Sequence, residues 1–213
     1  MAVLQERERM GALGNRASDG SFVPEERRMP FIAIDFEASC LPHYGRSFPI
    51  EVGIASAHGW SRSWLIRPHP TWSDWQWSAE AEALHGISRA RLAREGLEAG
   101  QVARLLRAAV GQSELIADSH FDDGWSRALF AASGATRPLP VTCLADLPAF
   151  HDVEADRLMI AMARADLQRL RRHRAEDDAR WLASLLDELG LDRLHAPAPV
   201  PVREAMPQLA VAR

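Results

Sequence analysis

The sequence is short of cysteine, tyrosine and long apolar runs, and it carries no excess of basic charge. Its 213 residues include two cysteines, Cys40 and Cys143, which are too few for a disulfide framework or a cysteine-rich zinc site. Such cysteine usage suits a reducing compartment, so we expect a cytoplasmic location. No run of about 18 apolar residues is present. The N-terminus also lacks the apolar centre of a signal peptide, so we expect neither membrane insertion nor export.

The charge balance limits how the protein could bind nucleic acid. The formal net charge is -4 at pH 7, which excludes a strongly basic coat and leaves only local contacts. Hydrophobic residues make up 47% of the chain, enough for one domain with a full-sized core. Residues 1–28 lack a sustained period and residues 196–213 are rich in Ala and Pro, so we expect flexible tails around a domain at 29–195. Nothing in the sequence indicates an oligomeric state.

Strand and helix patterns alternate along the expected domain. Residues 31–37 form a continuous apolar run, which is typical of a strand covered on both faces. Two more strands are expected at 50–57 and 61–68, close enough in sequence to pair antiparallel. This order predicts an α/β fold with a mixed five-stranded sheet and helices on both faces. The remaining expected elements are helices at 88–96, 101–110, 122–134, 154–170 and 175–189 and strands at 114–118 and 139–147.

Two acidic residues, Asp35 and Glu37, stand at the end of the first apolar run, FIAIDFE. Alternation along a strand puts both side chains on the same face. Like charges about 4 Å apart repel by roughly 4 kcal/mol at an effective dielectric constant of about 20. A hard divalent cation with oxygen ligands would offset that repulsion. The alternative is that the strand ends here and both carboxylates are solvated, which the short Asp-x-Glu pattern alone favours.

Two later helices each begin with an Asp-Asp pair, and helical phase predicts which aspartate of each pair faces the core. Asp122 falls on the apolar stripe of its helix, whereas Asp123 falls on a mostly polar face. Asp178 falls on the apolar stripe of the last helix, and Asp177 falls on its solvated face. A carboxylate at the start of a helix can also serve only the helix dipole, and this alternative stays open for Asp122.

Four acidic residues could therefore converge at the sheet: Asp35, Glu37, Asp122 and Asp178. A buried, unpaired carboxylate is costly, so metal ions explain four of them best. His173 stands just before the last helix, among arginines. A lone histidine in such a place is more often a surface residue than a catalyst, but its pKa range suits a general base.

The order Asp-x-Glu, then Phe-Asp, then His-x-x-x-x-Asp resembles the DEDDh exonucleases. This superfamily includes the epsilon proofreading subunit of DNA polymerase III, RNase T and oligoribonuclease. Asp35 and Glu37 match the first motif, Asp122 matches the second, and His173 with Asp178 matches the third. The resemblance covers nearly the whole of the expected domain and is specific in its spacing.

Two further segments add to the resemblance, and one departs from it. ALHGIS at 83–88 is similar to an H-G-I-[ST] segment that many members carry between the first two motifs. PIEVG at 49–53 is similar to a strand of a small bacterial branch. Many members have His-Asn ahead of the second-motif Phe-Asp, whereas Asp118 stands in the Asn position here. This departure puts substrate contacts at that point in doubt.

The resemblance implies a ribonuclease H-like sheet and two Mg²⁺ or Mn²⁺ ions held by Asp35, Glu37, Asp122 and Asp178. It also implies a 3′–5′ exonuclease that releases nucleoside 5′-monophosphates from the 3′ end of DNA or RNA, with His173 as the general base. Two other functions remain open. One is a catalytically weak nucleic-acid-binding module on the same fold, and the other is a phosphohydrolase of small phosphoesters.

The expected partner is nucleic acid rather than a membrane, and four residues are expected on the substrate side: Phe36, His85, Arg172 and Arg174. The two arginines belong to a basic cluster that could hold phosphates or could equally be a solvated helix end. His85 could instead only shape a turn. Glu51, on the neighbouring strand, could reach the site or pair with an arginine.

Overall fold

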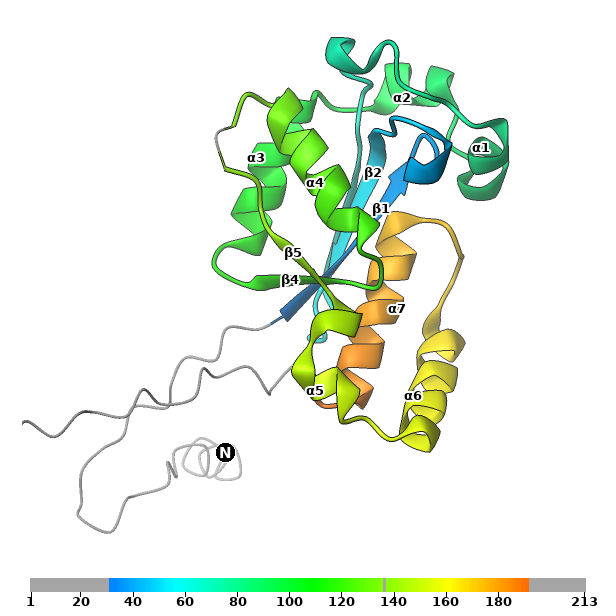
Figure 1. The fold of residues 1–213 in the computed structure, drawn as a ribbon, viewed down its shortest axis with the longest axis vertical. Coiled ribbons are helices and arrows are strands. Elements are labelled where there is room, and N and C mark those ends of the chain that lie inside the picture. Colours follow the sequence, from blue (N-terminus) through cyan, green and yellow to red (C-terminus); the bar gives the residue numbers. More distant parts are fainter. Residues whose placement is uncertain (1–30, 136, 192–213) are drawn as a thin grey trace, which may run out of the picture. The chain divides into compact units, whose positions relative to one another are not determined.

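The computed structural model describes residues 31–135 and 137–191, so both expected tails, 1–28 and 196–213, lie outside the described residues. The described strands form one sheet in the order β3-β2-β1-β4-β5. Strand β1 pairs antiparallel with β2 and parallel with β4, which confirms the predicted mixed sheet (Figure 1). The strands are β1 (Phe31–Ala38), β2 (Pro49–Ala55), β3 (Ser61–Leu65), β4 (Glu114–Ala117) and β5 (Val141–Cys143).

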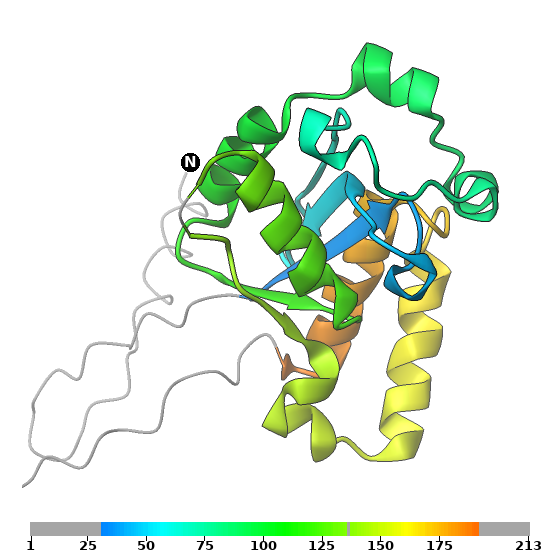
Figure 2. The same cartoon turned by 45° about the horizontal axis from the view of Figure 1, so that its top comes forward.

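Helices cover both faces of the sheet, as the sequence predicts (Figure 2). They are α1 (Ala79–His85), α2 (Arg89–Glu95), α3 (Ala99–Val110), α4 (Phe121–Ala132), α5 (Pro148–His151), α6 (Ala155–Gln168) and α7 (Ala175–Glu188). Short 3₁₀ turns lie at Pro42–Tyr44, Pro70–Trp72 and Leu144–Asp146. Among the described residues, no helix has the length and apolar character needed to span a bilayer.

Side-chain alternation along β1 divides the core into two clusters. Ile32, Ile34 and Phe36 pack into the cluster that includes α3 and α4. Phe31 and Ala33 pack into the cluster that includes α6 and α7. The odd-numbered positions of β1 therefore face α7, and Asp35 and Glu37 continue that series.

Some elements differ from the sequence-based expectation. Helix α1 and the one-turn helix α5 are not foreseen by it. The strand expected at 139–147 is limited to β5, because the chain turns at Leu144–Asp146 into a proline that begins α5. The face of α4 that carries Asp123 is also less polar than expected. Ser126 is fully buried there and donates a hydrogen bond to the Leu139 carbonyl at 2.8 Å.

Gly53, at the centre of β2, lets α7 approach the sheet closely. A Cβ atom at this position would lie 2.1 Å from the backbone carbonyl carbon and oxygen of Ala175. Real Cβ atoms essentially never come so close to backbone, so a side chain would push the start of α7 away. Gly53 is paired with Asp35 in the β1–β2 register, so this close approach occurs beside the acidic residues.

We predict that Gly53→Ala lowers the free energy of unfolding by about 1–3 kcal/mol or more, because it overpacks a rigid backbone contact. Gly124→Ala is the matched control. Gly124 lies in α4, and a Cβ atom there would meet nothing within 4 Å, so alanine should stabilise the helix by up to about 1 kcal/mol. Urea unfolding of the two variants measures both effects. Equal or reversed signs would contradict the close approach of α7 to β2.

Candidate active site

The end of β1 brings three acidic side chains together. Asp35 and Glu37 project from β1 toward α7, and Asp178 lies in the first turn of α7. One carboxylate oxygen from each of the three lies within 4.8 Å of the others. All three residues are partly exposed, so an ion or a phosphate group could reach them from solvent. The structure thus gathers three of the four acidic residues that the sequence indicates as metal ligands.

Asp122 comes to the same end of the sheet from the start of α4, on the other face. Its side chain is buried, and its Oδ1 accepts a hydrogen bond from the backbone N–H of Phe36 at 3.0 Å. Phe36 lies between Asp35 and Glu37, so this bond fixes Asp122 against the same stretch of β1. Asp122 is outside the group within 4.8 Å, but its negative charge contributes to raising the pKa of Asp35.

The pKa values reflect the cost of gathering these charges. Burial raises the pKa of Asp35 well above its ordinary value, and the charges of Asp122, Glu37 and Asp178 raise it further. Burial and the charges of Asp178 and Glu51 raise the pKa of Glu37 to about 8. Burial also raises the pKa of Asp122. Without a counter-ion, the folded site therefore favours the protonated form of Glu37 at neutral pH.

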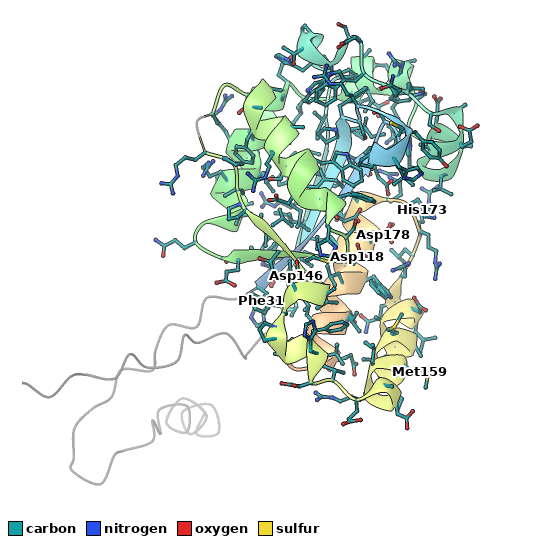
Figure 3. All side chains as sticks on the ribbon, viewed as in Figure 1. Phe31, Asp118, Asp146, Met159, His173 and Asp178 are labelled. Carbon is teal, nitrogen blue, oxygen red and sulfur yellow. The ribbon has the colours of Figure 1, made fainter. Side chains whose placement is uncertain are left out.

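Asp118 is a further acidic residue of this cluster, and sequence reasoning did not assign it to the site. It follows β4 directly, and Figure 3 shows it near Asp178. Burial and the charge of Asp178 raise the pKa of Asp118, and Asp118 in turn raises the pKa values of Asp35 and Asp122. The one sequence feature that could have pointed to Asp118 is its place ahead of the Phe-Asp motif, where many DEDDh exonucleases carry a neutral asparagine.

Glu51 is the buried acidic residue opposite Glu37 on β2, and it pairs with Arg174. The Nε and Nη2 atoms of Arg174 donate hydrogen bonds to the two Glu51 oxygens at 3.0 and 2.7 Å. The backbone N–H of Ala175 also donates to Glu51, at 3.3 Å. Of the two alternatives for Glu51, reaching the site or pairing with an arginine, the structure shows the ion pair. This pair connects the start of α7 to β2.

The same arginine helps to orient Asp178. The backbone N–H of Arg174 donates a hydrogen bond to Asp178 Oδ2 at 3.1 Å. On the other side, Arg169 Nη1 lies 3.5 Å from Asp178 Oδ1. Arg169 is itself held by stacking over the Trp181 ring, with its guanidinium carbon 4.4 Å from the ring centroid. Asp178 thus has one fixed orientation toward Asp35 and Glu37.

His173 lies on the segment between α6 and α7, exposed to solvent (Figure 3). Its φ of 59° is in the left-handed region, and within 31–135 and 137–191 no other non-glycine residue has a positive φ. A non-glycine residue in this region costs about 1–3 kcal/mol and often marks a functional segment. Arg174, the next residue, is held by Glu51, which fixes where the His173 side chain begins.

The predicted substrate-side residues lie in different environments. The Phe36 ring is buried in the core on the α4 side, so only its backbone reaches the site. Arg172 is exposed, with an ion pair to Asp166 at 4.0 Å, whereas the Arg174 guanidinium is occupied by Glu51. His85 is buried, and burial lowers its pKa to about 4, so the ring is neutral at pH 7. Its Nδ1 accepts a hydrogen bond from the Ile87 N–H at 3.0 Å.

The second aspartate of each pair has a structural partner instead. Asp123 is bound by Arg127 Nε at 2.6 Å and accepts the backbone N–H of Val141 at 3.3 Å, so it ties α4 to β5. Asp177 pairs with Arg180 at 3.4 Å. Its side chain is 14% exposed and that of Asp178 is 16% exposed, so exposure does not separate this pair. The two residues differ in direction: Asp178 points toward Asp35 and Glu37, whereas Asp177 points toward Arg180.

The donor set fits hard divalent cations. Carboxylate oxygens are the ligands that Mg²⁺ and Mn²⁺ prefer, and burial together with the neighbouring negative charges raises the pKa values of Asp35 and Glu37. Asp35, Glu37 and Asp178 could hold one such ion, and Asp122 lies close enough to influence it electrostatically.

No protein-family model and no curated protein matches the sequence. Solved structures of exonuclease I share its fold. E. coli exonuclease I in complex with a dA16 oligonucleotide has a TM-score of 0.55 at 14% identity, covering 76% of this chain and 42% of that one. Exonuclease I from Methylocaldum szegediense has a TM-score of 0.52 at 15% identity, covering 75% and 40%.

A zinc-bound form of the E. coli enzyme with single-stranded DNA is similar as well. Its TM-score is 0.53 at 14% identity, and the match covers 78% of this chain and 41% of that one. This chain therefore spans less than half the length of these proteins. At such identities the likeness establishes the fold, which is the ribonuclease H-like exonuclease fold that the sequence predicts.

We predict that Arg174→Ala lowers the free energy of unfolding by about 3–5 kcal/mol, because it leaves the buried Glu51 carboxylate without its cation. Arg172→Ala is the matched control, and it should change stability by less than about 0.5 kcal/mol because Arg172 is exposed. Urea unfolding measures both values. Similar stability of the two variants would contradict a structural role for Arg174 and favour the substrate-binding role.

We also predict that, in EDTA, the free energy of unfolding falls as pH rises from about 5 to about 8. In that window the unfolded chain has released the Glu37 proton, whereas the folded chain keeps it, since its pKa is about 8 when folded and 4.5 ordinarily. Above pH 8 the Glu37 contribution levels off. Glu37→Gln should lessen the fall, and Glu98→Gln, at an exposed ion pair with Arg67, should keep it. An unchanged pH dependence of the free energy of unfolding in Glu37→Gln would contradict a raised pKa of Glu37 in the folded state.

Proposed function

We propose that the protein is a metal-dependent 3′–5′ exonuclease of the DEDDh type, which hydrolyses DNA or RNA from the 3′ end and releases nucleoside 5′-monophosphates. The observation that carries the proposal is the convergence of Asp35, Glu37 and Asp178, with Asp122 beside them, on a fold shared with exonuclease I. Each of these residues also occupies its place in the motif order of that superfamily.

Asp35, Glu37, Asp122 and Asp178 would hold two Mg²⁺ or Mn²⁺ ions. When bound, such ions polarise the attacking water and stabilise the charge on the leaving 3′-oxygen. His173 would accept the proton from that water at a ring nitrogen. Its position supports this role, because it is exposed, lies five residues before Asp178 and adjoins the fixed Arg174.

The surroundings of the site support a nucleic-acid substrate. A cavity of about 470 Å³ lies just past the end of β1, lined by Cys40, Tyr44, Gln76, Trp77, Ser78 and Glu80. Tyr44 is 69% exposed there, and an exposed ring offers a surface on which a base can stack. Arg171 and Arg172, which immediately precede His173, are exposed and could contact backbone phosphates.

We predict that substitutions of the two aspartates within each Asp-Asp pair differ strongly in their effect on activity. Asp122→Asn and Asp178→Asn should each lower turnover by several orders of magnitude, because each would remove a ligand of a catalytic cation. Asp123→Asn and Asp177→Asn are the matched controls, and they should change turnover by a small factor, because these side chains pair with Arg127 and Arg180. Release of mononucleotides from matched DNA and RNA oligonucleotides with Mg²⁺ measures all four.

His173→Ala should lose about 10²–10⁴-fold in turnover and yet keep the stabilisation by Mg²⁺, because the base is not a ligand. Equal damage by Asp123→Asn and Asp122→Asn would contradict the ligand assignment. Absence of mononucleotide release from every oligonucleotide would refute the exonuclease function. In that case, metal binding by the parent protein would favour one of the two other functions.

A further inference from the structure

A second group of side chains that could bind a metal ion adjoins the carboxylate site and shares no residue with the proposed ligands of that site. It consists of His120, Cys143 and Asp146, and one ligand atom from each lies within 4.8 Å of the others. His120 immediately precedes α4, Cys143 ends β5, and Asp146 lies in the 3₁₀ turn that follows β5. Figure 3 shows Asp146 and, near it, Asp118, which belongs to the carboxylate site.

The contacts within this group already orient its members. His120 Nε2 lies 3.1 Å from Asp146 Oδ1. The Cys143 thiol is buried and lies 3.7 Å from the Asp118 carbonyl oxygen, while His120 and Asp146 are exposed. The buried Cys143 sulfur therefore lies at the base of the group, and the His120 nitrogen and the Asp146 oxygen lie nearer to solvent. An ion arriving from solvent could meet all three.

The chemistry of these donors differs from that of the carboxylate site. Imidazole and thiolate select Zn²⁺ and similar transition-metal ions, whereas Mg²⁺ and Mn²⁺ prefer oxygen ligands. Cys143 and Asp146 are also separated by two residues across a tight turn, and short spacing of this kind is typical of zinc ligands. Three protein ligands would leave the fourth position of a tetrahedral ion for water.

Two simpler explanations account for less of the arrangement. An exposed His–Asp ion pair explains His120 and Asp146, but it does not explain why both approach the one buried thiol of this edge. A nucleophilic cysteine activated by His120 would need a stabilised thiolate. Burial instead raises the pKa of the Cys143 thiol.

We propose that His120, Cys143 and Asp146 form a binding site for a thiophilic divalent cation of the Zn²⁺ class. The site goes beyond the proposed exonuclease function and does not depend on it. An ion held there would connect the start of α4 to the turn after β5. Asp122 is the second residue of α4, so the ion would also stabilise the position of that residue relative to β1.

Titration of the full-length, metal-free protein with Co²⁺ tests the site. Co²⁺ bound through Cys143 gives a thiolate-to-cobalt charge-transfer absorption in the near ultraviolet, which a site made of carboxylates alone does not give. Added Zn²⁺ should remove the absorption by displacing Co²⁺. Cys143→Ser should abolish it. His120→Ala should weaken Co²⁺ binding by about 100-fold or more, because loss of an outer-shell partner alone costs about 10–100-fold.

Two controls separate this site from the rest of the molecule. Cys40→Ser removes the other cysteine and should leave the absorption unchanged. Asp35→Ala disables the carboxylate site and should also leave it unchanged, so failure of the exonuclease proposal and failure of this one are distinguishable. His120 is exposed, so its variant should fold even if Cys143→Ser does not. No absorption in the parent protein, its persistence in Cys143→Ser, or undiminished affinity in His120→Ala would each overturn the proposal.

Discussion

The constraint on which the site depends is the mutual repulsion of carboxylates gathered where β1 ends. Asp35, Glu37 and Asp178 lie within ligand distance of one another, and Asp118 and Asp122 add their charge. Without a cation, burial and the neighbouring negative charges raise the pKa values of Asp35 and Glu37, so ionising these two groups destabilises the folded state. Binding of a divalent ion would relieve this repulsion, and we therefore interpret the cluster as a metal site rather than as a purely structural feature.

The rest of the domain holds these charges in place. Gly53 lets the backbone of α7 rest against β2, and the buried pair of Glu51 with Arg174 fastens that contact. Asp178 and His173 both depend on this junction, because they lie within four residues of Arg174. A buried ion pair is in general weak evidence for stability. The pair of Glu51 with Arg174 matters here because it helps to fix the orientation of Asp178, a predicted metal ligand, and the backbone position of His173, the predicted general base.

Much of this was predictable from the sequence, because periodicity reports which face of an element is buried. The order of the expected strands and helices indicated the mixed sheet, and the helical phase of Asp122 indicated that it faces the core. Phase was less informative for Asp177, because its side chain is as little exposed as that of Asp178, and the two differ in the direction they point and in their partners. An arginine partner for Glu51 was one of two alternatives, but neither its identity as Arg174 nor the proximity of Asp118 could be predicted, because both depend on contacts between elements distant in sequence.

Divalent-cation binding through carboxylate oxygens at the end of β1 is the property from which the proposed function follows. An anomalous-scattering map from crystals grown with Mn²⁺ tests it most directly, because it locates the ion without reference to activity. We expect a peak bound by Asp35, Glu37 and Asp178, with oxygen distances of about 2.0–2.6 Å, as for hard divalent ions. A map with no peak there at saturating Mn²⁺, while all three side chains are ordered, would contradict cation binding at this site.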